Sequence, residues 1–269
     1  MPAIALRAAS LVDVEFRLPR CLQVLARTRD PRPNAREHRL LELTSRGDRV
    51  PISLWLPTAP VPAPLVCLQP GAGESGDAGH LLAIDELISV GLAVATLDWP
   101  LRGRRASVKL SERLIEALAA DAADPNDAPL IEQFILQSVV DLAHTVETLA
   151  EMPEIRGDQI CLSGVGIAAH LVALLGSISP RPAALCLAPT RQPRVEHDLP
   201  LSALVGAGRK RPVLLLARKN AAEVPPEELE ALRLACPGPA DLERIAGRID
   251  PLDREGVRHV ARFVSRTFR

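Results

Sequence analysis

The chain has 269 residues, of which 47% are hydrophobic, and its formal net charge is −1. This length fits one large α/β domain or two small ones, and the near-neutral charge provides no general attraction to nucleic acid or to an anionic membrane. Aromatic residues make up only 2% of the chain, with no tyrosine, which argues against a stacking platform for bases or sugars.

The cysteines are widely spaced and form no Cys-x-x-Cys pair; they are Cys21, Cys67, Cys161, Cys186 and Cys236. Three of them stand in apolar, strand-like runs, which indicates reduced core thiols in a cytoplasmic protein. Cysteine and histidine do not cluster, so we expect no metal site, and no cofactor is expected either. We find no apolar run long enough to cross a membrane and no signal-peptide pattern.

We expect residues 1–37 to form an N-terminal extension, because the Pro-containing segment 29–34 interrupts the chain before the first clear pattern. Residues 38–269 are predicted to form one α/β domain. Its first elements are expected to be strands at 38–43 and 50–56, a Pro-rich connector at 57–64, a strand at 65–68, a Gly-rich loop at 70–76, a helix at about 80–90 and a strand at 92–97.

The clearest helix is predicted at 131–150, where apolar residues recur every three or four positions. Short apolar strands alternate with helices from there to the end of the chain, which predicts a mostly parallel sheet covered by helices on both faces. These later elements are expected to be strands at 159–163, 183–187 and 213–216, and helices at 167–176, from Pro225 onward, and at 257–268.

One short segment carries the strongest functional signal. Gly164-Val165-Gly166-Ile167-Ala168 follows an apolar strand and precedes an apolar helix, which is the setting of the nucleophile elbow, G-x-S-x-G. Gly166 stands at the serine position, and glycine has no side chain that could attack a substrate. Glycine does relieve the backbone strain of such a turn, because it has no Cβ.

Four local patterns occur in one order and together resemble the α/β-hydrolase superfamily, near its dienelactone-hydrolase and acyl-peptidase-like esterase branches. The first is Leu68 to Gly73, similar to the loop after the family's third strand. The second is Asp98 to Arg105, similar to D-x-P-x-H-G-x-R. The third, Val139 to Ile160, resembles the helix and connector before the elbow, and the fourth, Leu214 to Glu228, resembles the segment that carries the catalytic acid.

The resemblance implies a mostly parallel sheet and a Ser-His-acid triad, and it assigns each triad member to a position in this chain. The nucleophile falls on Gly166, the acid on Ala221 and the histidine on Arg248. None of the three can do the family's chemistry, which needs a nucleophile, a base and a carboxylate that orients the base.

This triad-free pattern suggests a non-catalytic binding, regulatory or scaffold protein, with carboxylic-ester hydrolysis as the ancestral activity. Two alternatives remain open. One is a divergent esterase, hydrolase or lyase-like enzyme that uses non-triad groups, for instance His170 or His80 with water. The other is an inactive subunit that partners an active hydrolase.

A ligand site is also predicted at the elbow. The amides of Val165, Gly166 and Ile167 are expected to point outward at a helix N-terminus, where an anion is favoured, and Gly71 and Ala72 are expected to add amides. Arg102 and Arg248 stand nearby in the family's pattern, so the cleft is expected to bind a small anion such as a carboxylate or phosphate; a protein partner is the other possibility, and the oligomeric state is left open.

Other polar residues near the elbow have simpler explanations. Ser163 and Cys161 are expected to be buried strand residues, and His170 a packing or surface residue of the helix. Glu74, Asp77 and His80 are expected to cap a helix or lie in a polar loop.

Overall fold

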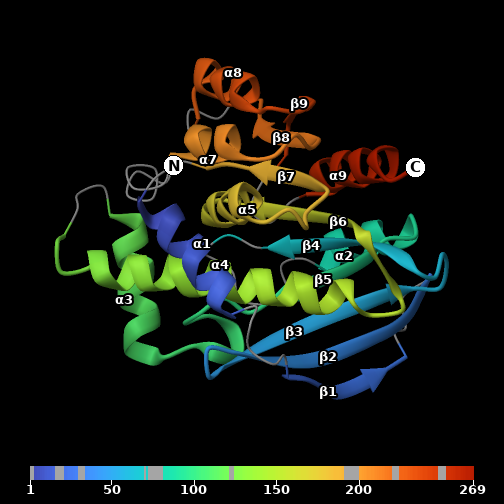
Figure 1. Cartoon of the computed structure of the whole chain (residues 1–269). Coiled ribbons are helices and arrows are strands. Elements are labelled where there is room, and N and C mark those ends of the chain that lie inside the picture. The colour runs from blue at the N-terminus through green and yellow to red at the C-terminus, as the bar shows by residue number, and fades with distance from the viewer. Residues whose placement is uncertain are drawn as a thin grey trace.

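The computed structural model describes residues 3–15, 21–29, 34–69, 71, 81–120, 124–190, 200–219, 224–247 and 253–269. These residues form one nine-stranded sheet in the order β1-β2-β3-β5-β4-β6-β7-β8-β9 (Figure 1). The strands are β1 (Cys21–Thr28), β2 (Ala35–Ser45), β3 (Asp48–Pro57), β4 (Ala63–Gln69), β5 (Ala93–Leu97), β6 (Ile155–Val165), β7 (Ala184–Ala188), β8 (Val213–Arg218) and β9 (Ala240–Ile245).

The sheet is antiparallel at one end and parallel through the rest. β1, β2, β3 and β5 pair antiparallel in that order, and β5, β4, β6, β7, β8 and β9 pair parallel. Every residue of β4 is buried, as expected for a strand that helices cover on both faces. The parallel strands therefore end at a common edge, where the loops that follow them meet.

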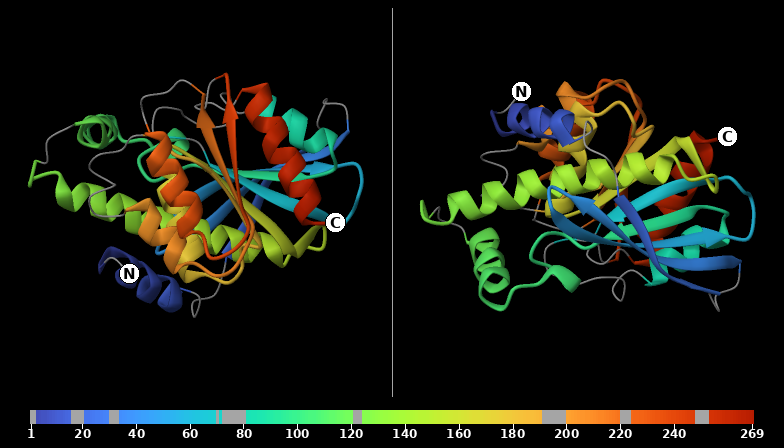
Figure 2. Two further views of the ribbon diagram at one scale, coloured as in Figure 1. Left: turned by 90° about the horizontal axis from the view of Figure 1, so that it is seen from above. Right: turned by 60° about the horizontal axis from the view of Figure 1, so that its bottom comes forward.

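Helices cover both faces of this sheet. They are α1 (Ala3–Glu15), α2 (Leu81–Ser89), α3 (Val108–Ala119), α4 (Ala128–Ala150), α5 (Ile167–Ile178), α7 (Leu201–Ala207), α8 (Pro226–Ala235) and α9 (Arg254–Thr267), with a short 3-10 turn, η2 (Gly103–Arg105). One apolar cluster joins the sheet to α1, α3, α4, α5 and α7, and a second joins it to α2 and α9. Figure 2 shows α1 and α9 on opposite sides of the sheet.

The predicted α/β class and the predicted strands and helices from residue 38 onward are confirmed, with ends that differ by a few residues. The sequence interpretation did not identify α1, β1, α3, α7 or β9. Within residues 1–37, α1 packs on α4, and β1 pairs with β2, so both belong to the main body of the protein. No helix in the described ranges has the length and apolarity needed to cross a membrane.

Candidate functional site

The turn between β6 and α5 has the backbone geometry of a nucleophile elbow. Gly166 lies between the strand and the helix with φ +60° and ψ −125°, a conformation that favours glycine because a Cβ would be strained there. Gly164 serves a different need: a Cβ on it would lie 2.4 Å from the carbonyl oxygen of Ala168. The strand and the helix therefore approach so closely that only glycine fits at position 164.

The amides at this turn are not all free for a ligand. Gly166 donates its N–H to the carbonyl of Ala188 in β7 at 2.9 Å, so the prediction that this amide faces the cleft is wrong. Ile167 and Ala168 begin α5, and the first amides of a helix have no acceptor within it. Of these two, Ile167 belongs to the predicted anion site, which stays a prediction, and Ala168 was not part of it; the positive end of the helix dipole lies at the same place.

The loop after β5 lies at the same edge of the sheet and is held rigidly. Asp98 accepts hydrogen bonds from the backbone N–H and Nε of Arg104, at 3.1 and 2.7 Å. A Cβ on Gly103 would lie 2.5 Å from Asp98 Oδ1. Leu101, a bulky residue, has φ +60°, and such strain persists only where the surroundings determine the backbone.

A buried ion pair fixes the end of this loop. Arg105 Nη1 lies 2.7 Å from Asp141 Oδ2 in α4, whose side chain is fully buried, and it also donates to the carbonyl of Asp98 at 3.2 Å. Asp48, the first residue of β3, binds the same guanidinium. Burial raises the pKa of Asp141, and the charge of Arg105 opposes this effect. Sequence reasoning missed this pair, although an aspartate in the apolar stripe of a helix is itself a signal of a buried partner.

Arg102 stands in the same loop, and no acidic side chain of the described residues forms an ion pair with it. Burial lowers the pKa of its guanidinium, and its buried Nη2 atom has no hydrogen-bond partner in the described part of the chain. A half-buried cation without a partner is costly.

Several predicted site residues lie outside the described residues: Ala72, Ala221 and Arg248, together with the nearby Glu74, Asp77 and His80. Gly71 is described and buried, two residues after β4. Gln69, at the end of β4, pairs with Gly164 in β6, and its buried Oε1 has no hydrogen-bond partner in the described part of the chain. Gln69 was not singled out from the sequence, because the residues before it form an apolar strand.

The remaining candidates are buried. Ser163 is 2% exposed and lies within the β6 ladder, opposite Leu68 and Cys186. The thiols of Cys161 and Cys186 lie 3.6 Å apart, and burial raises the pKa of Cys161 well above its usual range. His170 is 1% exposed, in α5. It is therefore not a surface residue, and it lies one helical turn after Gly166.

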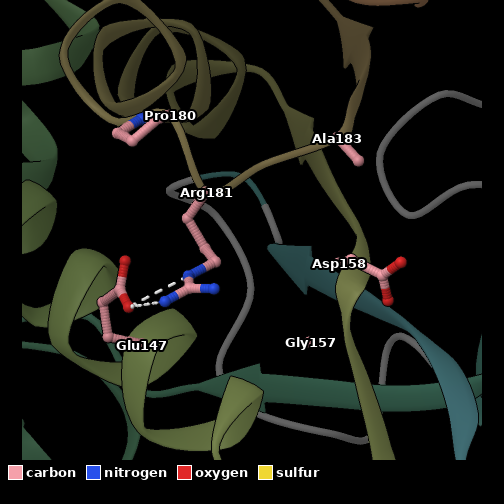
Figure 3. Close-up of a pocket in the computed structure, with 6 residues that line it drawn as sticks. All are labelled: Glu147, Gly157, Asp158, Pro180, Arg181 and Ala183. Carbon is pink, nitrogen blue, oxygen red and sulfur yellow. Dashed lines mark hydrogen bonds and ion pairs between the residues drawn. The ribbon is translucent and has the colours of Figure 1, made fainter.

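A surface cavity of about 460 Å³ is lined by residues at the start of β6 and in the connection between α5 and β7 (Figure 3). Gly166 follows Asp158 of this lining by eight positions, which corresponds to about 26 Å of extended strand, so the cavity lies far from the elbow. Arg181 in the lining donates two hydrogen bonds to Glu147, at 3.0 and 2.6 Å. We do not assign this cavity to the elbow site. Its lining residues are Glu147, Gly157, Asp158, Pro180, Arg181 and Ala183.

No family model matches the chain, and no curated protein matches it. Solved structures do. Acetyl xylan esterase 1 from a Thermoanaerobacterium species superposes with a TM-score of 0.73 over 100% of this chain and 95% of its own, at 15% identity. An acetyl xylan esterase from a Paenibacillus species superposes with a TM-score of 0.72 over 98% of this chain and 94% of its own, at 13% identity. A glucuronoyl esterase from Solibacter usitatus superposes with a TM-score of 0.65 over 98% of this chain and 92% of its own, at 9% identity.

This comparison corrects the interpretation of the chain as a non-catalytic protein. The three structures named above, which share its fold over nearly its whole length, are named as esterases, so the divergent-hydrolase alternative is the better supported of the sequence-based hypotheses. The strand order, the elbow at Gly166 and these structures together show that the chain adopts the α/β-hydrolase fold.

Proposed function

We propose that the chain is a divergent carboxylic-ester hydrolase in which a water molecule, not a serine, attacks the ester carbonyl. The observation that carries this proposal is the elbow geometry of Gly166 at the head of α5. It leaves the amides of Ile167 and Ala168 to stabilise the oxyanion that forms on attack. Because Gly166 has no side chain, a water can occupy the place of the nucleophile.

His170 is the proposed proton acceptor for this water. It follows Gly166 by four residues, so the two lie on the same side of the helix, and helical side chains tilt toward the N-terminus and the preceding turn. This direction takes the imidazole of His170 toward the elbow. The side chain of His170 is 1% exposed. His80, which lies outside the described residues, is the second candidate for this role.

The proposed substrates are esters that carry an anionic group. Arg102 supports this choice, since it is a half-buried guanidinium without a counter-ion among the described residues, in a loop that Asp98 and Arg105 hold in place. A carboxylate or phosphate on the substrate would supply that counter-ion. Gly71 and the amides at the start of α5 are assigned to the same proposed cleft.

We expect a slow enzyme. Removing the triad from a serine hydrolase leaves a rate roughly 10³–10⁴-fold above that in water, through the oxyanion hole and substrate binding alone. A positioned general base adds about 10²–10⁴-fold. The positions assigned to the triad, Gly166, Ala221 and Arg248, allow these contributions but not a covalent intermediate.

The experiment compares hydrolysis of phenyl acetate and 4-acetoxybenzoate, which differ by one carboxylate. We expect a higher kcat/KM for 4-acetoxybenzoate, a preference that Arg102→Gln removes and Arg266→Gln, a change on the far helix α9, retains. His170→Gln is expected to lower kcat for both esters by about 10²-fold or more, whereas Ser163→Ala leaves both unchanged. Absence of turnover in the wild-type protein, or turnover that survives both His170→Gln and His80→Gln, would refute the proposal.

A further inference from the structure

β1 forms one edge of the sheet and is paired on one side only. Its described partner is β2, to which it is antiparallel over Cys21–Thr28, and it is the outermost element at that end of the sheet in Figure 1. The backbone N–H and C=O groups on its outer side therefore have no strand partner among the described residues. Such a row of alternating donors and acceptors fits another β-strand.

The side chains of β1 do not protect this edge. Val24 is 42% exposed and Leu25 is 54% exposed, and most residues of the strand are exposed on both faces. Proteins usually blunt such an edge with proline, lysine or an inward-pointing charge. β1 contains no proline and no lysine, and its one charged residue, Arg27, stands near its C-terminal end.

The other edge of the same sheet is protected. β9 has three charged residues among its six, Asp241, Glu243 and Arg244. Asp241 forms an ion pair with Arg266 of α9, and Glu243 lies 3.5 Å from Nδ1 of His259. The chain thus carries three charged residues at β9 and only Arg27 at β1, so the open edge is a local property of β1.

We propose that β1 pairs with β1 of a second copy of the chain, antiparallel and around a two-fold axis. Self-pairing brings the apolar centre of the strand, at Val24 and Leu25, against itself. It also places the two Arg27 side chains at opposite ends of the interface, so no like charges face each other. The partner that this edge fits without repulsion is therefore its own copy.

The interface is expected to be weak. A register shift between Val24 and Ala26 leaves Leu25 as a bulge, and a bulge increases the local twist of a strand. The paired segment is therefore shorter than all of β1, and the dimer should dissociate on dilution. This proposal concerns a surface far from the elbow and does not depend on the proposed hydrolase activity.

The test is sedimentation velocity from dilute to concentrated protein, with Val24→Lys as the disrupting variant. Val108→Lys is the matched control, because it makes the same change at an 82% exposed valine in α3. We expect the wild-type protein and Val108→Lys to double in mass at high concentration and Val24→Lys to remain monomeric. A wild-type protein that stays monomeric throughout, or a dimer that Val24→Lys retains, overturns the proposal.

A second measurement does not depend on any variant. Hydrogen exchange of the peptide that spans residues 21–28 should slow as the wild-type concentration rises, because pairing protects the outer amides. A dimer that forms without added protection of this peptide overturns the proposal as well, since its interface would then lie elsewhere.

Discussion

Gly164 and Gly166 are both required at the turn before α5, for different physical reasons. Gly166 supplies a positive φ, whereas Gly164 allows a close approach to Ala168. Gly47 provides a reference, because it has φ +77° with nothing within 4 Å of a Cβ placed on it. Substitution of Gly47 by alanine therefore measures the free-energy cost of the positive φ alone, without the cost of steric crowding.

We expect Gly47→Ala to lower the free energy of unfolding by about 1–2 kcal/mol and Gly166→Ala by about 1–3 kcal/mol. Gly164→Ala should cost more than either, because a Cβ 2.4 Å from a backbone oxygen forces the strand and helix apart. Urea denaturation of the three variants measures the free energy of unfolding that each one loses and so ranks the three losses. Equal losses for Gly164→Ala and Gly47→Ala would contradict the close approach of strand and helix.

The five thiols differ sharply in environment. Burial raises the pKa of Cys67, and of Cys161 beside Cys186, so their thiolates are suppressed. Cys21 is exposed, and Cys236 is half-buried with a raised pKa. We expect Ellman's reagent to modify Cys21 quickly, Cys236 slowly, and the three buried cysteines, Cys67, Cys161 and Cys186, only after denaturation. Cys21→Ser should remove the fast phase; fast modification of a third thiol in the native protein would show that the sheet opens.

At the scale of elements, the Arg105–Asp141 pair joins the loop after β5 to α4, and Asp48 at the start of β3 binds the same guanidinium. Arg105→Met leaves Asp141 as a buried, uncompensated charge, which typically costs about 3–5 kcal/mol, and we expect it to destabilise the fold by about that amount. Asp141→Leu should cost less, because Arg105 keeps its ion pair with Asp48. The double variant should recover most of the loss, because two apolar side chains of similar volume replace the pair.

Denaturation of the two single variants and the double variant forms a mutant cycle that measures the coupling. Losses that add in the double variant would mean that the pair does not act as a unit. Circular dichroism of each variant at low denaturant shows whether the native state is retained.

A second charged cluster links β2 to the segment before β6. Buried Arg39 donates through Nη2 to Glu37 at 3.0 Å and to Glu154 at 2.6 Å. The hydrogen bond from Arg39 holds the pKa of Glu37 below its ordinary value. For Glu154, burial acts to raise the pKa, but the hydrogen bond and charge of Arg39 prevail and the pKa is lowered.

A lowered carboxyl pKa contributes stability above the unfolded-state pKa, about 4.3, and this contribution is lost as the pH falls through the lower folded-state value. We therefore expect the wild-type protein to lose stability below about pH 4.3 and Glu154→Gln to show a shallower loss over that range. Glu132→Gln, which alters a more exposed carboxylate paired with Arg7, should match the wild-type profile. Parallel profiles for Glu154→Gln and the wild type would contradict the role assigned to Arg39.

At the scale of the whole molecule, the sequence predicts those parts of the fold in which burial repeats along the chain. Buried strands such as β4 and the apolar stripe of α4 stand out because each follows one period. β9 does not stand out, since its charged side chains bind residues of α9 that are distant in sequence. The elbow at Gly166 was predictable from a local pattern, whereas the ion pair of Arg105 with Asp141 joins residues 36 positions apart.

α1 is the clearest example of an element that the sequence pattern does not reveal. It was not predicted, yet its buried residues Ala5, Ala8 and Val12 belong to the main core cluster, and it packs on α4. Because alanine is small, the apolar stripe of α1 is weak in the sequence. The helix is recognised only from its packing on α4 in the structure. The protein is therefore expected to depend on α1 for the closure of one face of its core.

Ala8→Glu tests this dependence. Ala8 is fully buried, so a glutamate there must either be buried without a partner or displace α1 from α4, and both outcomes cost several kcal/mol. Leu6→Glu places the same side chain on the same helix at a position that is 60% exposed, where substitutions change stability by about 0.5 kcal/mol or less. The difference between the two variants in urea denaturation therefore measures the docking of α1, and equal stability would mean that α1 does not close the core in solution.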